Sequence, residues 1–180
     1  MKKLLLAIAT TSITGTSANA EFQPVRQEDL KLAQCAGMTA GNQTVDYLLL
    51  KSITREKYVE QLRYTMGLYW AIKFDLAKIG VSRTLGNADQ LKAEDILRWS
   101  ETDTAALDQM AGSNHDAITQ SAKSGAFDAA TYDSIVNCQI FLTMAAFKMS
   151  RDGIGSLVMN SKIMDQLLEE HVQTVEYLSE

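Results

Sequence analysis

Apolar residues recur along this chain with the spacing of helices rather than that of strands. From Asp29 onward they fall mainly at i, i+3, i+4 and i+7, and runs of strictly alternating apolar and polar residues are absent. That period is typical of amphipathic helices, which bury one side against a core. The pattern predicts helices over residues 29–51, 55–79, 88–111, 114–123, 129–149 and 156–178.

Glycines and capping residues mark where these helices are expected to begin and end. Gly80 and Gly112 lie where the apolar period breaks, so each is predicted to end a helix. Thr54 and Asp128 stand just before helical runs and are predicted N-caps, because their side-chain oxygens can accept from free backbone N–H groups. The fold class expected is all-α, a small helical bundle of about five to six helices with one disulfide.

The first two predicted helices carry patterns that indicate neighbours on more than one side. In residues 29–51, Ala33, Gly37 and Gly41 form a row of small residues that lets another backbone come close. Cys35 points to the opposite side, where a second neighbour is expected. Residues 55–79 are apolar around most of the helix, which predicts a central position; the apolar positions are Tyr58, Leu62, Tyr64, Met66, Leu68, Tyr69, Trp70, Ile72, Phe74 and Leu76.

The first twenty residues have the pattern of a secretory signal peptide. Lys2 and Lys3 precede a short apolar stretch, and the residues around Ala20 fit the small-x-small rule for signal peptidase. Cleavage is predicted between Ala20 and Glu21, leaving one helical domain over residues 21–180. The apolar stretch is much shorter than the roughly 20 residues that span a bilayer. We therefore expect an exported protein, periplasmic or extracellular, without a membrane anchor after cleavage.

The charge of the expected mature chain argues against one class of partner. Removing residues 1–20 leaves 15 of the 17 Lys and Arg residues against 22 Asp and Glu, a net charge of −7. A surface of that sign repels phosphate backbones, and the chain has no basic cluster. Nucleic-acid binding is therefore not expected.

Two cysteines remain in the expected mature chain, Cys35 and Cys138. In an exported protein an even pair most simply forms a disulfide, here between the first and fifth predicted helices. A closed loop of about 100 residues corresponds to roughly 4–5 kcal/mol in the chain-entropy model. Two separate buried thiols are the alternative, and no C-x-x-C redox motif is present.

The two histidines are interpreted as structural or solvated. His171 falls on an apolar stripe between Leu168 and Val175, so its ring is expected to be buried and its pKa lowered. A shielded ligand or base at His171 is the alternative. His115 is expected to be a solvated residue at a helix start. Their spacing matches no zinc motif, C-x-x-C-H for haem is absent, and no catalytic, metal-binding or cofactor-binding residue is assigned.

Carboxylates supply the remaining candidate chemistry. Glu94, Glu101 and Asp108 recur every seven residues, and such a row could hold a cation, although a solvated and partly ion-paired face is favoured. No pair among the 22 acidic residues can be singled out by spacing.

These observations favour a non-enzymatic protein that binds another protein, in an inhibitor, immunity or chaperone-like role. One alternative is a carrier of a small apolar ligand, held among Met and aromatic residues of the second and last helices. Another is a hydrolase with a carboxylate pair and no local signature. An exposed apolar patch would favour protein binding, a large apolar cavity the carrier, and two close carboxyls in a cleft the enzyme.

Overall fold

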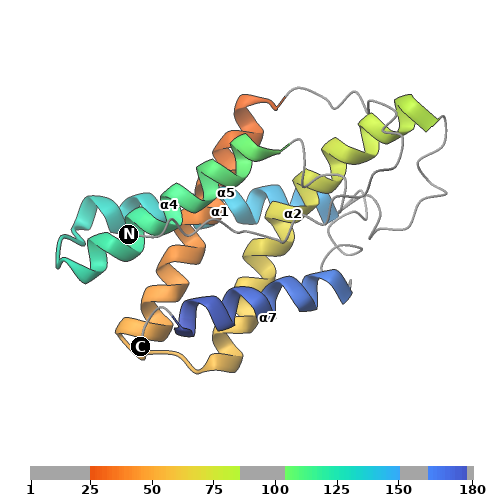
Figure 1. The fold of residues 1–180 in the computed structure, drawn as a ribbon. Coiled ribbons are helices and arrows are strands. Elements are labelled where there is room, and N and C mark those ends of the chain that lie inside the picture. The colour runs from red at the N-terminus through yellow and green to blue at the C-terminus, as the bar shows by residue number, and fades with distance from the viewer. Residues whose placement is uncertain (1–24, 86–103, 151–161, 178–180) are drawn as a thin grey trace.

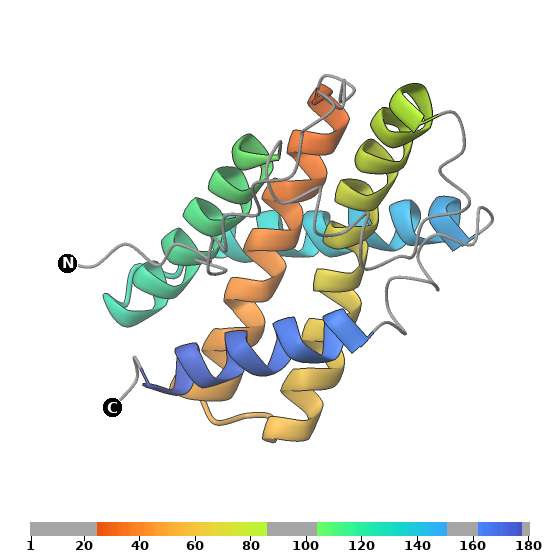
Figure 2. The same cartoon turned by 45° about the vertical axis from the view of Figure 1, so that its right-hand side comes forward.

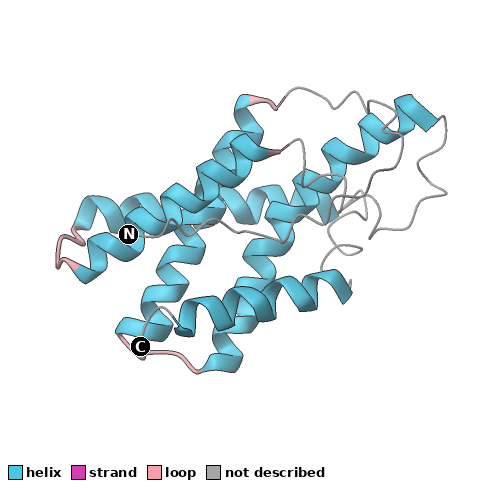
Figure 3. Ribbon diagram, viewed as in Figure 1, coloured by secondary structure: helices cyan, strands magenta, loops and turns pink. Residues whose placement is uncertain are grey.

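The computed structural model describes residues 25–85, 104–150 and 162–177, and all the secondary structure in these ranges is helical (Figures 1 and 3). The expected all-α bundle is confirmed. The elements are α1 (Gln27–Thr44), which continues as the π-helical turn η1 (Val45–Leu49), then α2 (Arg55–Leu85), α4 (Ala105–Lys123), α5 (Ala129–Ser150) and α7 (Lys162–Tyr177).

Several predictions fall outside the described residues. The signal peptide over residues 1–20 and the cleavage between Ala20 and Glu21 are among them, as is most of the predicted helix 88–111 with Glu94 and Glu101. These stay predictions, and so does the extent of the mature domain over residues 21–180.

The core is built around α1 and α2. Helix α1 contacts α2, α4 and α5, and α2 also contacts α5 and α7 (Figure 2). The small row of α1 faces α4 so closely that a Cβ built on Gly37 would lie 2.1 Å from the carbonyl oxygen of Ala111. A Cβ on Gly41 would lie 2.9 Å from the carbonyl oxygen of His115. The expected close neighbour at the small row is therefore α4.

The disulfide joins the other side of α1 to α5. Cys35 and Cys138 are bonded, with their Cα atoms 4.7 Å apart, and both are buried. The neighbour expected on the Cys35 side is thus α5, as the pairing of the two cysteines predicts. Helix α1 is held between α4, where backbones touch, and α5, where a covalent bond fixes the contact.

Two predicted helix ends are wrong. Helix α2 continues through Gly80 to Leu85, and α4 runs without a break from Ala105 through Gly112 to Lys123. A glycine inside a helix costs only about 1 kcal/mol relative to alanine, which burial of one helix face readily outweighs. In α4 the buried face consists of Leu107, Ala111, His115 and Ile118.

The predicted N-caps are confirmed. The Thr54 hydroxyl accepts from the backbone N–H of Lys57 at 3.3 Å, and the Asp128 carboxylate accepts from that of Thr131 at 2.8 Å. Each satisfies a backbone donor that the first turn of a helix leaves free.

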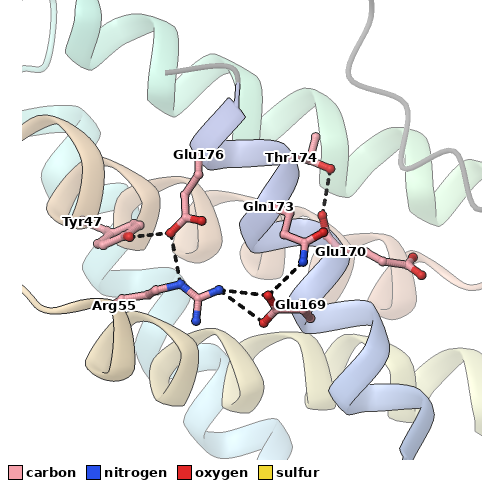
Figure 4. Close-up of polar contacts among 7 residues, drawn as sticks. All are labelled: Tyr47, Arg55, Glu169, Glu170, Gln173, Thr174 and Glu176. Atoms are coloured by element: carbon pink, nitrogen blue, oxygen red, sulfur yellow. Dashed lines mark hydrogen bonds and ion pairs between the residues drawn. The ribbon is translucent and has the colours of Figure 1, made fainter. Parts of the chain in front are cut away.

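Polar contacts tie α7 to the corner between η1 and α2 (Figure 4). Arg55, at the start of α2, donates through Nε to Glu176 at 3.1 Å and through Nη2 to both Glu169 oxygens at 3.1 and 3.2 Å. Tyr47 also donates to Glu176, at 2.6 Å, and Gln173 donates to Glu169 at 3.0 Å. One guanidinium thus fixes two carboxylates that are two turns apart on α7.

Candidate functional site

Helix α5 presents apolar side chains both to the core and to solvent. Its inner face carries Ile135, Cys138 and Leu142, which are buried. On the outer side, the apolar residues have exposed fractions of 54% at Ile140, 69% at Met144 and 73% at Phe147. The spacings of four and three residues place these three on one line along the helix, opposite the buried face.

Further residues extend this line toward the start of the helix. Tyr132 is 58% exposed, and Val136, one turn later, is half-buried. We call the five residues Tyr132, Val136, Ile140, Met144 and Phe147 the α5 stripe. From Tyr132 to Phe147 it is about 22 Å long at the rise of an α-helix.

The surroundings of the α5 stripe are polar but nearly uncharged. Asn137, Gln139 and Thr143 are exposed beside it, and Asp133 is the only charged residue in 129–147. A surface of this kind attracts a partner through apolar contact rather than through long-range electrostatics. The disulfide expected at Cys138 marks the inner face of this helix, but the sequence analysis missed the outer one. The signal was present, because residues 129–149 are apolar on two faces.

A second candidate site is a buried polar cluster where α1, α2 and α4 meet. The Thr44 hydroxyl lies 2.9 Å from the Tyr58 hydroxyl and 3.1 Å from His115 Nε2, and Asp116 lies 3.3 Å from His115 Nδ1. Burial raises the pKa of Tyr58 to about 12, so the phenol is neutral at physiological pH. The expectation that His115 is a solvated turn residue is wrong. His115 lies in the middle of α4, and it is buried.

The structure brings the two histidines together. The ring of His171, on α7, stands edge-on to that of His115, with centroids 5.7 Å apart. The Nε2 atom of His171 is buried without a hydrogen-bond partner. Burial, with a smaller contribution from His115, lowers the pKa of His171 to about 4. Whether His171 has only a structural role stays a prediction.

An apolar pocket lies beside these histidines. It has a volume of about 50 Å³, and its walls come from α1, α2, α4 and α7. A wider cleft of about 350 Å³ lies between α4 and α5, and its walls are both polar, as at Asn114 and Thr131, and apolar, as at Ile118. Among the described residues, each of these hollows contains a single carboxylate, Asp116 in the first and Asp128 in the second.

Asp108, which the sequence analysis grouped in an acidic row, forms an ion pair with the buried Lys73. Lys73 donates to its two carboxylate oxygens at 3.0 and 3.2 Å, and Tyr69 donates to it as well. The Lys73 side chain is only 2% exposed, and its ammonium lies 4.0 Å from the centroid of the Trp70 ring. Lys73 and Tyr69 thus satisfy this carboxylate, which favours ion pairing over cation binding for Asp108.

Two kinds of feature are absent from the described residues. No group of three or more His, Cys, Asp and Glu side chains there is arranged to hold a metal ion. No helix in the same residues is long and apolar enough to cross a membrane.

Comparison with known proteins adds no assignment. No protein-family model matches the chain, and no curated protein or solved structure matches it significantly.

Proposed function

We propose that this protein acts by binding another protein through the α5 stripe. The observation that carries the proposal is the exposure of Ile140, Met144 and Phe147 along one line of a helix whose opposite face is buried. Large apolar side chains gathered in one place on a small domain commonly mark an interaction site. Export to the periplasm or the extracellular space is part of the same proposal, and the disulfide is compatible with it.

The partner we propose is a protein with an apolar groove that encloses the outer side of α5. Helices bind grooves through anchors spaced three and four residues apart, as these are. The anchors Met144 and Phe147 would be fully desolvated there, and Asn137, Gln139 and Thr143 would lie at the polar rim.

A second copy of this chain fits the α5 stripe less well. A strip about 22 Å long and one helix wide covers roughly 200 Å², so any stable partner must also enclose the sides of the helix to approach the ~800 Å² that each partner buries in a stable interface. Enclosing the helix would need an apolar groove in the other copy. The apolar pocket found in the described residues has only about 50 Å³, and the larger cleft has mixed polar and apolar walls.

A carrier of an apolar cargo is less well supported, because the apolar pocket of about 50 Å³ is far smaller than the roughly 300 Å³ typical of such sites, and the cleft of about 350 Å³ has mixed polar and apolar walls that include Asp128. A hydrolase is not supported either, since neither hollow brings two carboxyls together among the described residues.

The test combines site-specific crosslinking with affinity measurement. A photoreactive residue replaces Met144 in the full chain expressed in its native cell, and a matched probe replaces Gln139, which is exposed on the same helix but beside the stripe. We expect an adduct with another protein from position 144 and little from position 139. That protein is then purified and titrated with the wild type, Met144→Glu and Gln139→Glu.

We expect Met144→Glu to raise the dissociation constant at least tenfold, because the substitution places a charge in a desolvated contact. Gln139→Glu adds the same charge beside the stripe and should change it by less than about threefold. Equal effects would contradict the proposal. An adduct with a second copy would assign the stripe to self-association instead, and an adduct only within one chain would show that the chain covers its own stripe.

A further inference from the structure

Helix α7 is attached to the rest of the fold differently from α4 and α5. A disulfide joins α5 to α1, and the backbones of α4 and α1 touch at Gly37. Helix α7 contains neither a cysteine nor a glycine, so it has no link of either kind. It packs against α2 through a buried apolar face, which consists of Met164, Leu167, Leu168, Val172 and Val175.

Ion pairs with two arginines of α2 hold the polar sides of α7. Arg55 bonds both Glu169 and Glu176 (Figure 4), and Arg63 Nη2 lies 2.6 Å from Asp165 Oδ1. The side chains in these pairs are between 35% and 62% exposed, and ion pairs that are this exposed contribute little to stability. An element held in this way opens locally more readily than a core helix.

His171 is the polar residue beside the apolar face of α7. Its ring makes no hydrogen bond among the described residues, and its Nε2 atom is buried. The titratable groups that surround the ring are His115 and Asp116 on α4 and Tyr69 on α2, whereas the walls that α1 contributes are apolar. Asp116 lies beside the His115 ring instead, at 3.3 Å from Nδ1. No described carboxylate therefore bonds His171.

The carboxylates next to His171 in the sequence also have other partners. Glu169 accepts from Arg55, and Glu170 accepts from Gln166 at 2.9 Å. A positive charge on the ring would thus be buried without a bonded counter-charge while α7 is docked. Such a charge is unfavourable in the docked state and acceptable in water.

The docking of α7 is consequently linked to proton uptake. Burial, with a smaller contribution from the charge of His115, lowers the pKa of His171 to about 4 in the docked state. An imidazole in water titrates near 6.5, so an undocked α7 binds the proton more readily. Between about pH 6.5 and pH 4, each pH unit therefore shifts the equilibrium up to about tenfold toward the undocked state.

We propose that α7 is released by acid: proton uptake by His171 undocks it from α2 as a unit, while α1 and α5, which the disulfide joins, stay folded. Undocking exposes the apolar face of α7 and the surface of α2 beneath it. Acid would thus open an apolar surface that is covered at neutral pH. The α5 stripe takes no part in these contacts, so this proposal does not depend on partner binding there.

Hydrogen exchange measured by mass spectrometry between pH 7.5 and pH 4.5 tests the release on the mature protein. Dividing the observed rates by the intrinsic rates at each pH gives a protection factor for each helix. We expect the protection of α7 to fall roughly 50-fold over this range, which follows from a pKa of about 4 when docked and about 6.5 when undocked. The protection of α1, the internal control, should change by less than about threefold.

Two variants separate the effect of the proton from that of the ion pairs. His171→Leu cannot take up the proton, so the protection of α7 in this variant should change by less than about threefold over the same range. Arg55→Gln keeps the histidine and loses two ion pairs, so α7 should be less protected at every pH with the same pH dependence as in the wild type. Circular dichroism establishes that both variants are folded. If His171→Leu does not fold, His171→Gln, which is also neutral throughout the range, takes its place.

Four results would overturn the proposal. The first is α7 protection in the wild type that does not change with pH. The second is an equal loss of protection in α1 and α7, which would mean that the whole domain unfolds. The third is an undiminished pH dependence in His171→Leu. The fourth is a loss of that dependence in Arg55→Gln, which would assign the release to the ion pairs.

Discussion

Two glycine-to-alanine substitutions at the contact between α1 and α4 should change stability in opposite directions. At Gly37 the added methyl would lie 2.1 Å from the carbonyl oxygen of Ala111, and the distances to the Ala111 carbonyl carbon and Cα are 2.8 and 2.9 Å. Those atoms are backbone and cannot rotate away. At Gly112, on the facing helix, the added methyl meets nothing within 4 Å.

The magnitudes follow from the geometry. Ordinary contact begins at 3.4 Å, so accommodating the methyl that Gly37→Ala adds requires α1 and α4 to separate locally by about 1.3 Å. Overpacking typically costs about 1–3 kcal/mol, and a clash with rigid backbone lies at the upper end of that range; the ~1 kcal/mol that alanine gains over glycine in a helix offsets part of the cost. We expect Gly37→Ala to lower the free energy of unfolding by about 2 kcal/mol and Gly112→Ala to raise it by about 0.5–1 kcal/mol.

Urea unfolding followed by circular dichroism measures both variants against the wild type. The midpoint should fall for Gly37→Ala and rise for Gly112→Ala, with the slope of the transition unchanged. For a domain of this size, about 2 kcal/mol corresponds to a lowering of the melting temperature by roughly 4–8 °C. If Gly37→Ala were as stable as the wild type, α1 and α4 would not approach each other at Gly37, and the packing described here would be wrong.

Three further predictions concern α7 and the disulfide. Between about pH 6.5 and pH 4 the unfolded chain takes up a proton on His171 that the folded chain resists, so stability is full above pH 6.5 and falls below it. Urea midpoints across this range should fall less steeply for His171→Leu, and parallel curves for the two proteins would contradict the lowered pKa of His171. The double variant Cys35→Ser/Cys138→Ser should lose about 3–5 kcal/mol, while thiol titration of the denatured, unreduced wild type should find no free sulfhydryl. Arg55→Gln should speed amide hydrogen exchange in α7 more than in α4, because Arg55 holds Glu169 and Glu176, and equal effects on both helices would refute that role.

Local sequence signals were sufficient for features that depend on neighbouring residues. Thr54 and Asp128 cap the helices that follow them because a side-chain oxygen needs only a nearby backbone donor. The small row of α1 predicts a close neighbour, since only a helix without side chains there admits another backbone. The disulfide pairing could be predicted without any structural information, because two cysteines allow only one pairing within the chain.

Features that depend on distant residues could not be read in this way. The hydroxyl that bonds His115 belongs to Thr44, 71 residues earlier, so local pattern placed His115 at a solvated turn. Gly112 suggested a break, but burial of α4 against α1 outweighs the cost of one glycine. Residues 129–149 are apolar on two faces, and although Cys138 marks the inner one, only the packing of the other helices shows that the outer face is left uncovered.

The central claim, that a partner protein covers the α5 stripe, is tested most directly by oxidative footprinting in the native cell and on the purified protein. Tyr132 and Met144 report on the stripe, Tyr177 is an exposed reference on α7, and Met164 is a buried reference. We expect Tyr132 and Met144 to be oxidised in the purified protein and protected in the cell, with Tyr177 reactive and Met164 unreactive in both. Equal oxidation of Met144 in the cell and in the purified protein would contradict the claim.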